Sequence, residues 1–573
     1  MKEKPSTIYY NGNIHTMVDK KDVYGAMAIL NGKIMALGTD DEVISLKGKN
    51  TIVYDLKNHV VVPGLIETHT HIFRVGLSEL HEEKFIPTSV KELLEYIKGK
   101  AKVIKPGEWI YFHNTYPTRI KEYRFPTLKE LDDVAPNNPV YVDGAYAGQA
   151  NSYALRILNI DENTPEPNDS KFIRDKQSGK LTGLLFRYSH IVRKAFGSGN
   201  HNIEDIKQGF LNIQANYHKL GITSVIDAMS SEDDIKALNE LYEEGKLGLR
   251  TILTGLVSSV DSAEENLENL KTLLAIPPEW SKLCFCKVMV DGGILTGTSY
   301  MRKPYDDKSG IFGINFEDFR GIIQYNISQL LEFIHIAFKT GLQMTAHCIG
   351  DAAIDVLLDA YESYESCQTG NNINIYQKKN SIYHEEMNIY RKKNSIKNKR
   401  YSIIHCDFTD DYTLERIKNL NLSVLFQPAW HYMDGDILSK VLDSETMESF
   451  MPYKKFVDMN ISASAGSDHM IKYDSMLSQN PYNPFISLYN MVTRKTRLGT
   501  IIGSENCISR YDALAMYTSK ASYISFDEKN KGTLEVGKNA DFAVLSHDYF
   551  NCHEEEIKNI SSVITVVDGN VVN

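Results

Sequence analysis

The stretch VVPGLIETHTHIF, residues Val61–Phe73, decides the fold because it joins an apolar strand to two closely spaced histidines. His69 and His71 are two residues apart, so on a strand both rings point to the same face. The apolar approach through Pro63-Gly64 places them near the carboxyl end of that strand, where barrel enzymes keep their sites. Two imidazoles from one strand suit a divalent metal, most often zinc. A lone H-x-H pair is common, so this pair gains weight only from polar residues at later strand ends.

Short apolar, β-branched runs alternate with amphipathic helical stretches along the middle of the chain. This alternation predicts a parallel sheet with crossover helices. Eight such runs favour a (β/α)8 TIM barrel, an α/β fold, over an open sheet. The expected strands are Val60–His71, Thr223–Ala228, Arg250–Thr254, Phe285–Val290, Gln343–His347, Ser402–His405, Ser423–Gln427 and Ile461–Gly466.

Both ends of the chain consist of short strand-like runs joined by Gly/Asn turns. Asn31-Gly32, between the runs Ala26–Leu30 and Lys33–Leu37, is a typical hairpin signal. Neither end carries enough apolar surface to fold alone. We therefore expect a small β-sandwich domain built from residues 1–62 and 525–573, with the barrel at residues 63–524 between them.

Two insertions interrupt the expected barrel. The gap between its first two strands is too long for one crossover, so we expect an α+β subdomain at about residues 75–215, with a helix over Val90–Ala101 and a strand over Pro139–Val142. The segment 366–400 repeats INIYQKKNSI (Ile373–Ile382) as MNIYRKKNSI (Met387–Ile396). We expect a surface insertion without chemistry there, on the face opposite the catalytic loops. A basic docking patch is the alternative.

Three further polar residues stand at the ends of later strands. His347 ends the fifth expected strand, His405 ends the sixth, and Asp468 follows the eighth. Taken singly, each is better explained as a hydrogen-bonded histidine or an N-capping aspartate. Together with His69 and His71 they converge on one mouth, because the carboxyl ends of all barrel strands meet there. The pattern indicates a metal centre.

Lys287 lies in the otherwise apolar fourth strand, within LCFCKVMVDGG (Leu283–Gly293). A lysine inside an apolar strand must find a partner or lose its charge. Two outcomes stay open: a salt bridge to a barrel carboxylate, or reaction with CO2 to give a carbamate that bridges two metals.

Composition excludes several classes of protein. Hydrophobic residues make up 42% and charged residues 24%, as in a globular protein with a large core. The net charge of −11 gives no basic footprint, so we expect no nucleic-acid partner. Apolar runs are much shorter than a membrane span and no signal core opens the chain, so we expect no membrane partner.

Seven cysteines without regular spacing favour the reducing cytoplasm. Alternation turns Cys348 and Cys406 away from the lumen, toward the helices.

The chain resembles the amidohydrolase superfamily, and within it amidohydrolase family 3, the branch of YtcJ-like proteins and N-substituted formamide deformylases. The resemblance covers nearly the whole chain. Its landmarks besides the histidines are Asn31–Ile34 (NGKI), Gly107–Ile110 (GEWI), Leu128–Val140 (LKELDDVAPNNPV), Leu181–Phe186 (LTGLLF), Leu220–Val225 (LGITSV), His347–Asp351 (HCIGD) and Gly532–Leu545 (GTLEVGKNADFAVL).

The resemblance implies a metal-dependent hydrolase of non-peptide carbon–nitrogen bonds, in a linear amide or an N-substituted formamide. It implies one or two divalent ions, with zinc expected first, a small-molecule amide substrate and, as one assembly, a homodimer. The implied metal ligands are His69, His71, His347, His405 and Lys287, the last expected as its carbamate. The substrate carbonyl would be polarised by the metal or by His405, and Asp468 would carry the proton from a metal-activated hydroxide to the leaving nitrogen.

Two residues depart from the family pattern in the inserted subdomain. Tyr146 stands near a position where this branch often has histidine, and Arg187 where it often has glutamate. Arg187 either recognises a substrate carboxylate or is a surface arginine. Tyr300, Gln427 and Trp430 are further candidates for the substrate pocket.

Two alternatives remain beside the linear-amide hydrolase. The same metal core suits a deaminase or a cyclic-amide hydrolase. A non-catalytic barrel scaffold is disfavoured, because such a chain would be expected to lose metal ligands and this chain has the whole set.

Overall fold

A sheet of eight parallel strands forms the centre of the molecule, with its neighbours in the order β8-β14-β15-β16-β17-β18-β19-β20. The computed structural model describes residues 3–81, 85–113, 115–167, 169–197, 201–305, 310–314, 317–366, 395–471, 474–476 and 480–573. The eight strands are β8 (Leu65–Thr70), β14 (Ile222–Asp227), β15 (Arg250–Leu256), β16 (Ser281–Met289), β17 (Gln343–Cys348), β18 (Ser402–His405), β19 (Ser423–Phe426) and β20 (Ser462–Ala465). Each overlaps one of the eight runs expected from the sequence.

The first and last strands of this sheet meet and bring it close to a closed barrel. The amide of Asp468 donates to the carbonyl of His69 at 2.8 Å, and that of His71 donates to the carbonyl of His469 at 2.9 Å. Earlier on the same strand, the Thr68 hydroxyl donates to the carbonyl of Ala465 in β20 at 2.9 Å. The TIM-barrel prediction is confirmed.

Alternation along the strands divides the apolar side chains into two layers. Inside the barrel, one cluster is built by Ile226, Ile252, Phe285, Ile404 and Leu425, each from a different strand. The neighbouring residues face outward and pack against the helices. Cys286, Cys348 and Cys406 belong to this outer layer, where all three are fully buried. The expected outward orientation of Cys348 and Cys406 agrees with this packing.

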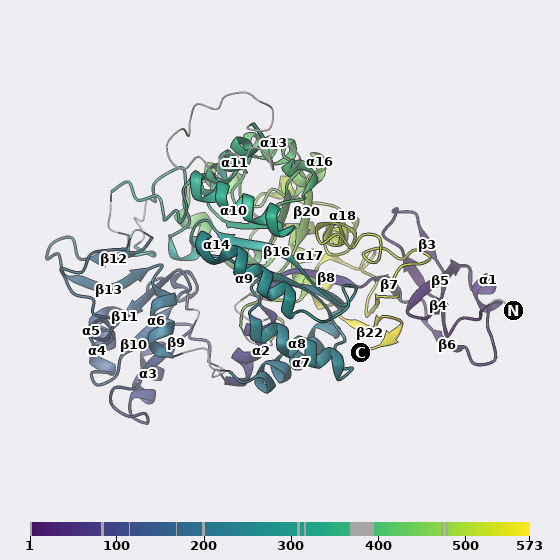
Figure 1. Ribbon diagram of the computed structural model, residues 1–573, viewed down its shortest axis with the longest axis horizontal. Coiled ribbons are helices and arrows are strands. Elements are labelled where there is room, and N and C mark those ends of the chain that lie inside the picture. The colour runs from purple at the N-terminus through teal and green to yellow at the C-terminus, as the bar shows by residue number, and fades with distance from the viewer. Residues whose placement is uncertain are drawn as a thin grey trace.

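Helices connect and cover the barrel strands (Figure 1). They are α2 (Ile72–His81), α7 (Ile203–His218), α8 (Glu232–Glu243), α9 (Val260–Leu273), α10 (Ile327–Thr340), α11 (Asp351–Ser366), α13 (Asp411–Asn419), α14 (Pro428–Val441) and α17 (Pro484–Thr493). Side chains fix their starts: Ser231 and Asn326 form capping boxes at α8 and α10.

The run Val60–His71, expected as one strand, forms two strands that belong to different sheets. β7 (Val60–Pro63) pairs with β2 (Asn13–His15) and β21 (Phe542–Leu545), whereas β8 pairs with β14 in the barrel. The chain crosses between the sheets at Gly64, where an added Cβ would lie 2.2 Å from the Thr223 hydroxyl oxygen. A glycine fits this crossing because the side chain of Thr223, in the barrel strand β14, lies too close to leave room for a Cβ.

A second sheet, in the order β12-β13-β11-β10-β9, lies in the chain between the first two barrel strands. Its strands are β9 (Ile110–Phe112), β10 (Val140–Asp143), β11 (Ala147–Ala150), β12 (Lys171–Arg174) and β13 (Leu181–Phe186). Its helices are α3 (Val90–Ala101), α4 (Leu128–Val134), α5 (Ser152–Ile157) and α6 (Ser189–Phe196). We call this part the inserted sheet. It lies at the opposite end of the molecule from the amino-terminal strands, with the barrel between them (Figure 1).

Both ends of the chain contribute to one six-stranded sheet, in the order β23-β22-β21-β7-β2-β3. A four-stranded sheet, β5-β4-β1-β6, adjoins it in sequence. Their strands are β1 (Thr7–Tyr10), β2 (Asn13–His15), β3 (Val23–Tyr24), β4 (Ala26–Leu30), β5 (Lys33–Gly38), β6 (Ile52–Asp55), β21 (Phe542–Leu545), β22 (Ser562–Val567) and β23 (Asn570–Val571). Asn31 and Gly32 both have positive φ, as the turn between β4 and β5 requires.

The repeated segment expected as a surface insertion lies mostly outside the described residues, which stop at Ser366 and resume at Ser395. The flanking elements are α11 and β18, so the segment joins a helix to the following strand. Among the described residues, no helix combines the length and the apolar character needed to cross a membrane.

Candidate metal centre

Four histidines from three strand ends meet at the mouth of the barrel. The ring centroids of His347 and His405 are 4.4 Å apart, and those of His69 and His405 are 5.5 Å apart. The His69 and His71 rings lie 5.6 Å apart at nearly a right angle. Residues separated by more than 330 positions in the sequence therefore share one small space.

Asp468 stands between the two histidines of the first strand. Its Oδ1 lies 3.4 Å from Nε2 of His69 and 3.4 Å from Nε2 of His71. Tetrahedral zinc, with bonds of about 2.0–2.1 Å, would separate its ligand atoms by about 3.3 Å. The spacing of these three atoms therefore fits a divalent cation.

The backbone at this mouth is strained. His405 and Cys406 have φ values of 71° and 53°, and Asp468 has 53°. Such left-handed conformations are uncommon for residues other than glycine and are held only where the surroundings impose them. The strand ends are thus bent to aim His405 and Asp468 at the shared space.

Burial keeps the histidines uncharged. It lowers the pKa of His69 to about 4 and that of His405 to about 3, with Lys287 adding to the effect at His69. It lowers the pKa of His347 well below the ordinary value, and it also lowers that of His71. Neutral imidazoles offer the lone pair that a metal requires.

Asp468 stays ionised in this setting. Burial by itself raises its pKa, but the contacts from His69 and His71 outweigh burial and hold the pKa well below its ordinary value. A negatively charged carboxylate therefore lies beside the two imidazoles, in a position to accept a proton from water in the shared space.

Lys287 lies inside the barrel at the bottom of the same space and is 3% exposed. Burial lowers its pKa to about 8, although Asp468 and Asp227 favour the charge. None of the described residues forms a salt bridge or hydrogen bond with its ammonium group within the usual distances. The sequence left two outcomes open for Lys287, a salt bridge or a carbamate, and among the described residues the salt bridge is absent.

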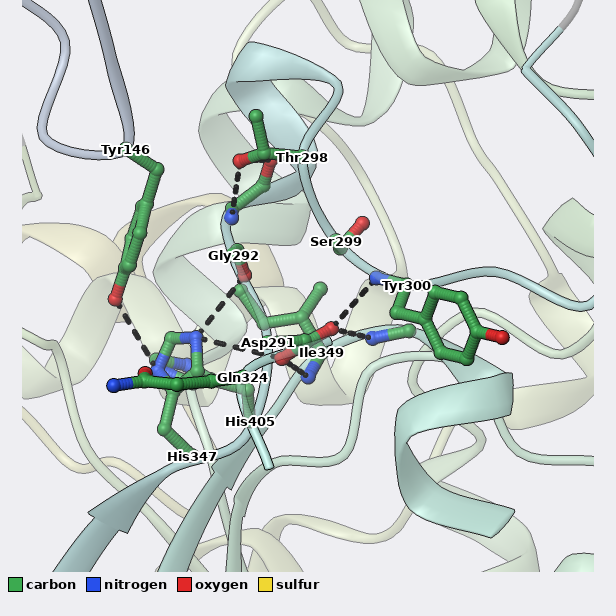
Figure 2. Close-up of polar contacts among 12 residues, drawn as sticks. Tyr146, Asp291, Gly292, Thr298, Ser299, Tyr300, Gln324, His347, Ile349 and His405 are labelled. Carbon is green, nitrogen blue, oxygen red and sulfur yellow. Dashed lines mark hydrogen bonds and ion pairs between the residues drawn. The ribbon is translucent and has the colours of Figure 1, made fainter. Parts of the chain in front are cut away.

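His347 is oriented by the loop that follows β16, as Figure 2 shows. Its Nε2 lies 3.1 Å from the carbonyl oxygen of Gly292 and 3.7 Å from Oδ1 of Asp291. Nε2 therefore carries the proton, and Nδ1 offers its lone pair to the centre. A carboxylate behind a ligating histidine is a common device for fixing its ring and tautomer.

Asp291 is a positioning residue that the sequence reasoning did not single out. Its carboxylate accepts backbone hydrogen bonds from Ile349 at 3.0 Å, from Gly350 at 2.9 Å and from Tyr300 at 3.0 Å. It thereby fixes the loop after β17 behind His347. Its place four residues after Lys287, at the end of the same strand, was the available signal.

Gln427 lies next to His405 and fixes its ring. Its Oε1 is 2.6 Å from Nδ1 of His405, and its Nε2 donates to the carbonyl of Leu425 at 3.0 Å. The amide orientation is thus set by the strand, so Oε1 accepts from Nδ1 and leaves Nε2 of His405 for the centre. Expected as a substrate contact, Gln427 contacts a histidine of the centre instead.

The inserted sheet supplies Tyr146 from the turn between β10 and β11. Its hydroxyl lies 3.4 Å from Nδ1 of His347, and Figure 2 shows it pointing down to that ring. Burial, followed by the charge of Asp468, raises its pKa well above the ordinary value, so the hydroxyl keeps its proton. A proton donor is therefore fixed above the histidines.

Arg187 ties the inserted sheet to the barrel. Its backbone amide donates to the carbonyl of Tyr146 at 2.7 Å, and its Nη1 donates to the carbonyl of Asp291 at 2.7 Å. Its Nη2 donates to Gln324. Arg187 is not a free surface arginine; it holds Tyr146 in place through these contacts.

Tyr300 and Trp430 lie at the edge of this arrangement. Tyr300 contributes its backbone amide to Asp291, while its ring points away from His347 (Figure 2). Trp430 packs near Tyr116, with Arg119 5.5 Å from its ring centroid. Neither side chain joins the histidine group.

A cavity of about 930 Å³ begins at His71 and runs between the barrel and the inserted sheet. Its wall is strongly aromatic, with Phe85, Tyr96, Trp109, Tyr111, Phe112 and Phe196 along the inserted part. The cavity is large enough for a small organic molecule and reaches the metal centre.

The chain is similar to known proteins over nearly its whole length. The sequence model described as the amidohydrolase family matches residues 53–573. N-substituted formamide deformylase of Arthrobacter pascens is 25% identical over 98% of this chain and 96% of its own length. YtcJ of Bacillus subtilis (strain 168), to which an amidohydrolase activity is ascribed, is 23% identical over 99% of both chains.

The fold recurs in a solved structure. An uncharacterized metal-dependent hydrolase from Pyrococcus horikoshii OT3 superposes with a TM-score of 0.66 at 21% identity, over 96% of this chain and 99% of the other.

Proposed function

Because the chain belongs to the amidohydrolase family, we propose that it hydrolyses a non-peptide carbon–nitrogen bond in a linear amide or an N-substituted formamide. The observation that carries this proposal is the position of Asp468 Oδ1, 3.4 Å from Nε2 of both His69 and His71. The formamide deformylase that matches nearly the whole chain supports the choice of bond.

The residues that would hold the cation are His69, His71, His347 and His405, with Lys287 as a further ligand once carboxylated. Its pKa of about 8 leaves part of the amine uncharged near neutral pH, and the uncharged amine is the form that reacts with CO2. When bound, a divalent cation such as zinc acts as a Lewis acid and lowers the pKa of its water to about 7.

Asp468 is the proton carrier in the proposed reaction. Its carboxylate stays ionised and faces the same space as the imidazoles, so it can take a proton from the attacking water. It then delivers that proton to the nitrogen of the leaving amine. A positioned acid–base group of this kind contributes about 10²–10⁴-fold in rate.

Tyr146 stabilises the developing charge on the other side. Its protonated hydroxyl, held through Arg187, can donate to the carbonyl oxygen as that oxygen becomes negative. A fixed donor in a water-excluded site is effective because it does not reorganise during the reaction. The aromatic wall of the cavity would bind the remainder of the substrate and exclude bulk water.

The experiment joins metal quantification to a hydrolysis screen of N-formyl compounds, N-acyl compounds, cyclic amides and dipeptides. We expect bound zinc or a similar metal, and release of a free amine together with formate or another acid. Release of ammonia would move the assignment to a deaminase, and turnover of dipeptides alone would contradict the non-peptide bond.

Asp468→Asn tests the role of the carboxylate. We expect this variant to keep its metal and lose turnover by about 10²–10⁴-fold. Normal turnover by the variant would show that the proton carrier is another residue. Substitution of the exposed Asp474 by Asn is the matched control and should change nothing.

A further inference from the structure

A second group of metal-ligating side chains lies outside the barrel centre and consists of His81, His201 and Asp205. One ligand atom from each lies within 4.8 Å of the other two. Nε2 of His81 is 3.2 Å from Oδ2 of Asp205, close to the separation of about 3.3 Å between two ligands of tetrahedral zinc. The rings of His81 and His201 are stacked, with centroids 5.1 Å apart.

Two barrel helices bring these residues together. His81 is the last residue of α2, and Asp205 lies in the first turn of α7. The helices touch at Gly76 and Gly209, where an added Cβ on either would lie 2.5–2.6 Å from the other's backbone. Because this contact fixes both helices, it also fixes the positions of His81 and Asp205, and His201 directly precedes Asn202, the N-cap residue of α7.

The group lies where the inserted sheet is connected to the barrel, between the end of α2 and the start of α7. The chain leaves the barrel just after His81 and returns to it just before His201, and both residues line the cavity that begins at His71. A cross-link at this place would join the two ends of the insertion at the rim of that cavity.

The chemistry of the group suits a cation. His201 is half-buried beside the ring of His81, and an imidazole nitrogen is a ligand that zinc and similar metals prefer. The side chain of His81 is 42% exposed and that of Asp205 is 35% exposed, so an ion can enter from solvent and keep a water as its remaining ligand.

We propose that His81, His201 and Asp205 form a second divalent-cation site that links the two chain segments connecting the inserted sheet to the barrel. Two imidazoles and one carboxylate favour a borderline metal such as zinc, cobalt or nickel over calcium or magnesium. The bound ion ties α2 to the return of the chain into α7 and thereby restrains the wall of the cavity. This proposal does not depend on the hydrolase reaction.

Calorimetric titration of zinc into protein whose barrel centre is already loaded tests the site. We expect one further binding event in the wild type, with a rise in melting temperature as the ion stabilises the folded state. His81→Ala and His201→Ala should each weaken this event by more than about 100-fold, because even loss of a residue behind a ligand costs about 10–100-fold. Circular dichroism checks that both variants fold.

Two control variants separate this site from other histidines and from the barrel centre. His547→Ala removes an exposed histidine far along the chain and should keep the further event. His69→Ala weakens the barrel centre and should also keep it. Absence of any further event in the wild type, or its survival in both His81→Ala and His201→Ala, would overturn the proposal.

Discussion

At the scale of single residues, the candidate centre depends on contacts that orient its histidines. His347 is set by the Gly292 carbonyl and by Asp291, and His405 is set by Gln427. Nε2 of His405 is left for the shared space, whereas Nδ1 of His347 also lies 3.4 Å from the Tyr146 hydroxyl. Protein contacts therefore fix both rings, and the side chains with candidate ligand atoms within 4.8 Å of one another are His69, His71 and Asp468.

Replacement of Tyr146 by Phe removes the hydroxyl above His347 and keeps the ring. We expect kcat to fall by about 10²–10³-fold, the usual cost of losing a donor to a developing oxyanion. Metal content should stay unchanged. Tyr300→Phe is the matched control, because its ring points away from the histidines (Figure 2). Equal kcat values for the two variants would exclude a role for the Tyr146 hydroxyl.

Asp143 predicts a pH dependence of stability in the inserted sheet. It is fully buried and accepts hydrogen bonds from Tyr111 at 2.5 Å, from Ser189 at 2.7 Å and from Arg193 at 2.5 Å. Burial raises its pKa, but Arg193 and the hydroxyl donors outweigh burial and lower it to about 2. The unfolded carboxyl has a pKa of about 3.9, so the ionised form favours folding by roughly 2–3 kcal/mol.

This stabilisation is fully present above about pH 5, shrinks as the pH falls below the unfolded pKa of about 3.9, and is gone once the pH has fallen through about 2, because the carboxyl is then protonated in both states. Denaturant unfolding of the wild type and of Asp143→Asn between pH 2.5 and 7 measures it. We expect the difference in unfolding free energy to be largest at neutral pH and to shrink in acid. A difference that is constant with pH would rule out a role for the charge.

The sequence predicted that these four histidines lie close together, but not which residues lie behind them; their role as metal ligands remains a prediction. His69, His71, His347 and His405 were recognisable because each stands at the end of an apolar run. Asp291 acts through backbone amides of another loop, and no local pattern shows where those amides lie. The role of Lys287 remains a prediction, since its burial is confirmed and its chemistry is untested.

At the scale of elements, the packing of α2 on α7 has a precise requirement. Gly76 and Gly209 face one another so closely that backbone touches backbone. Helix interiors disfavour glycine relative to alanine by about 0.5–1 kcal/mol. Two glycines at one crossing therefore indicate that close approach matters more here than helix propensity.

Gly209→Ala tests this crossing. The new methyl would lie 2.6 Å from the carbonyl carbon of Gly76. We expect a loss of at least about 1–3 kcal/mol in unfolding free energy, because the helices must move apart. Gly99→Ala on α3 is the control: nothing lies within 4 Å of its added Cβ, so a gain of about 0.5–1 kcal/mol is expected. If both variants had the same stability, the close packing would be unimportant.

Whether a segment forms a helix or a strand was predictable where the spacing of its apolar residues was regular. The residues at which it begins and ends were harder to predict. The run Ser402–His405 and the helix Val90–Ala101 match the structure exactly in range. β16 begins at Ser281, four residues before the expected Phe285, because the mixed sequence SKLC pairs with β15 despite its polar residues. Pairing with a neighbour, which is absent from the local sequence, decides such an end.

At the scale of the whole molecule, the barrel brings together residues that are distant in sequence, and the inserted sheet covers them. Eight recurring runs were enough to predict the barrel. The contact through Tyr146 and Arg187 could not be derived in this way, because it depends on how two separately folded sheets meet. The division into domains at residues 62 and 524 remains a prediction.

Diffraction at the zinc absorption edge, from crystals of the protein loaded with zinc, tests the central claim most directly. We expect an anomalous peak at the barrel mouth, about 2.0–2.2 Å from ligand atoms of His69 and His71. A fully loaded crystal with no peak within bonding distance of either histidine would contradict the metal centre and the hydrolase built on it.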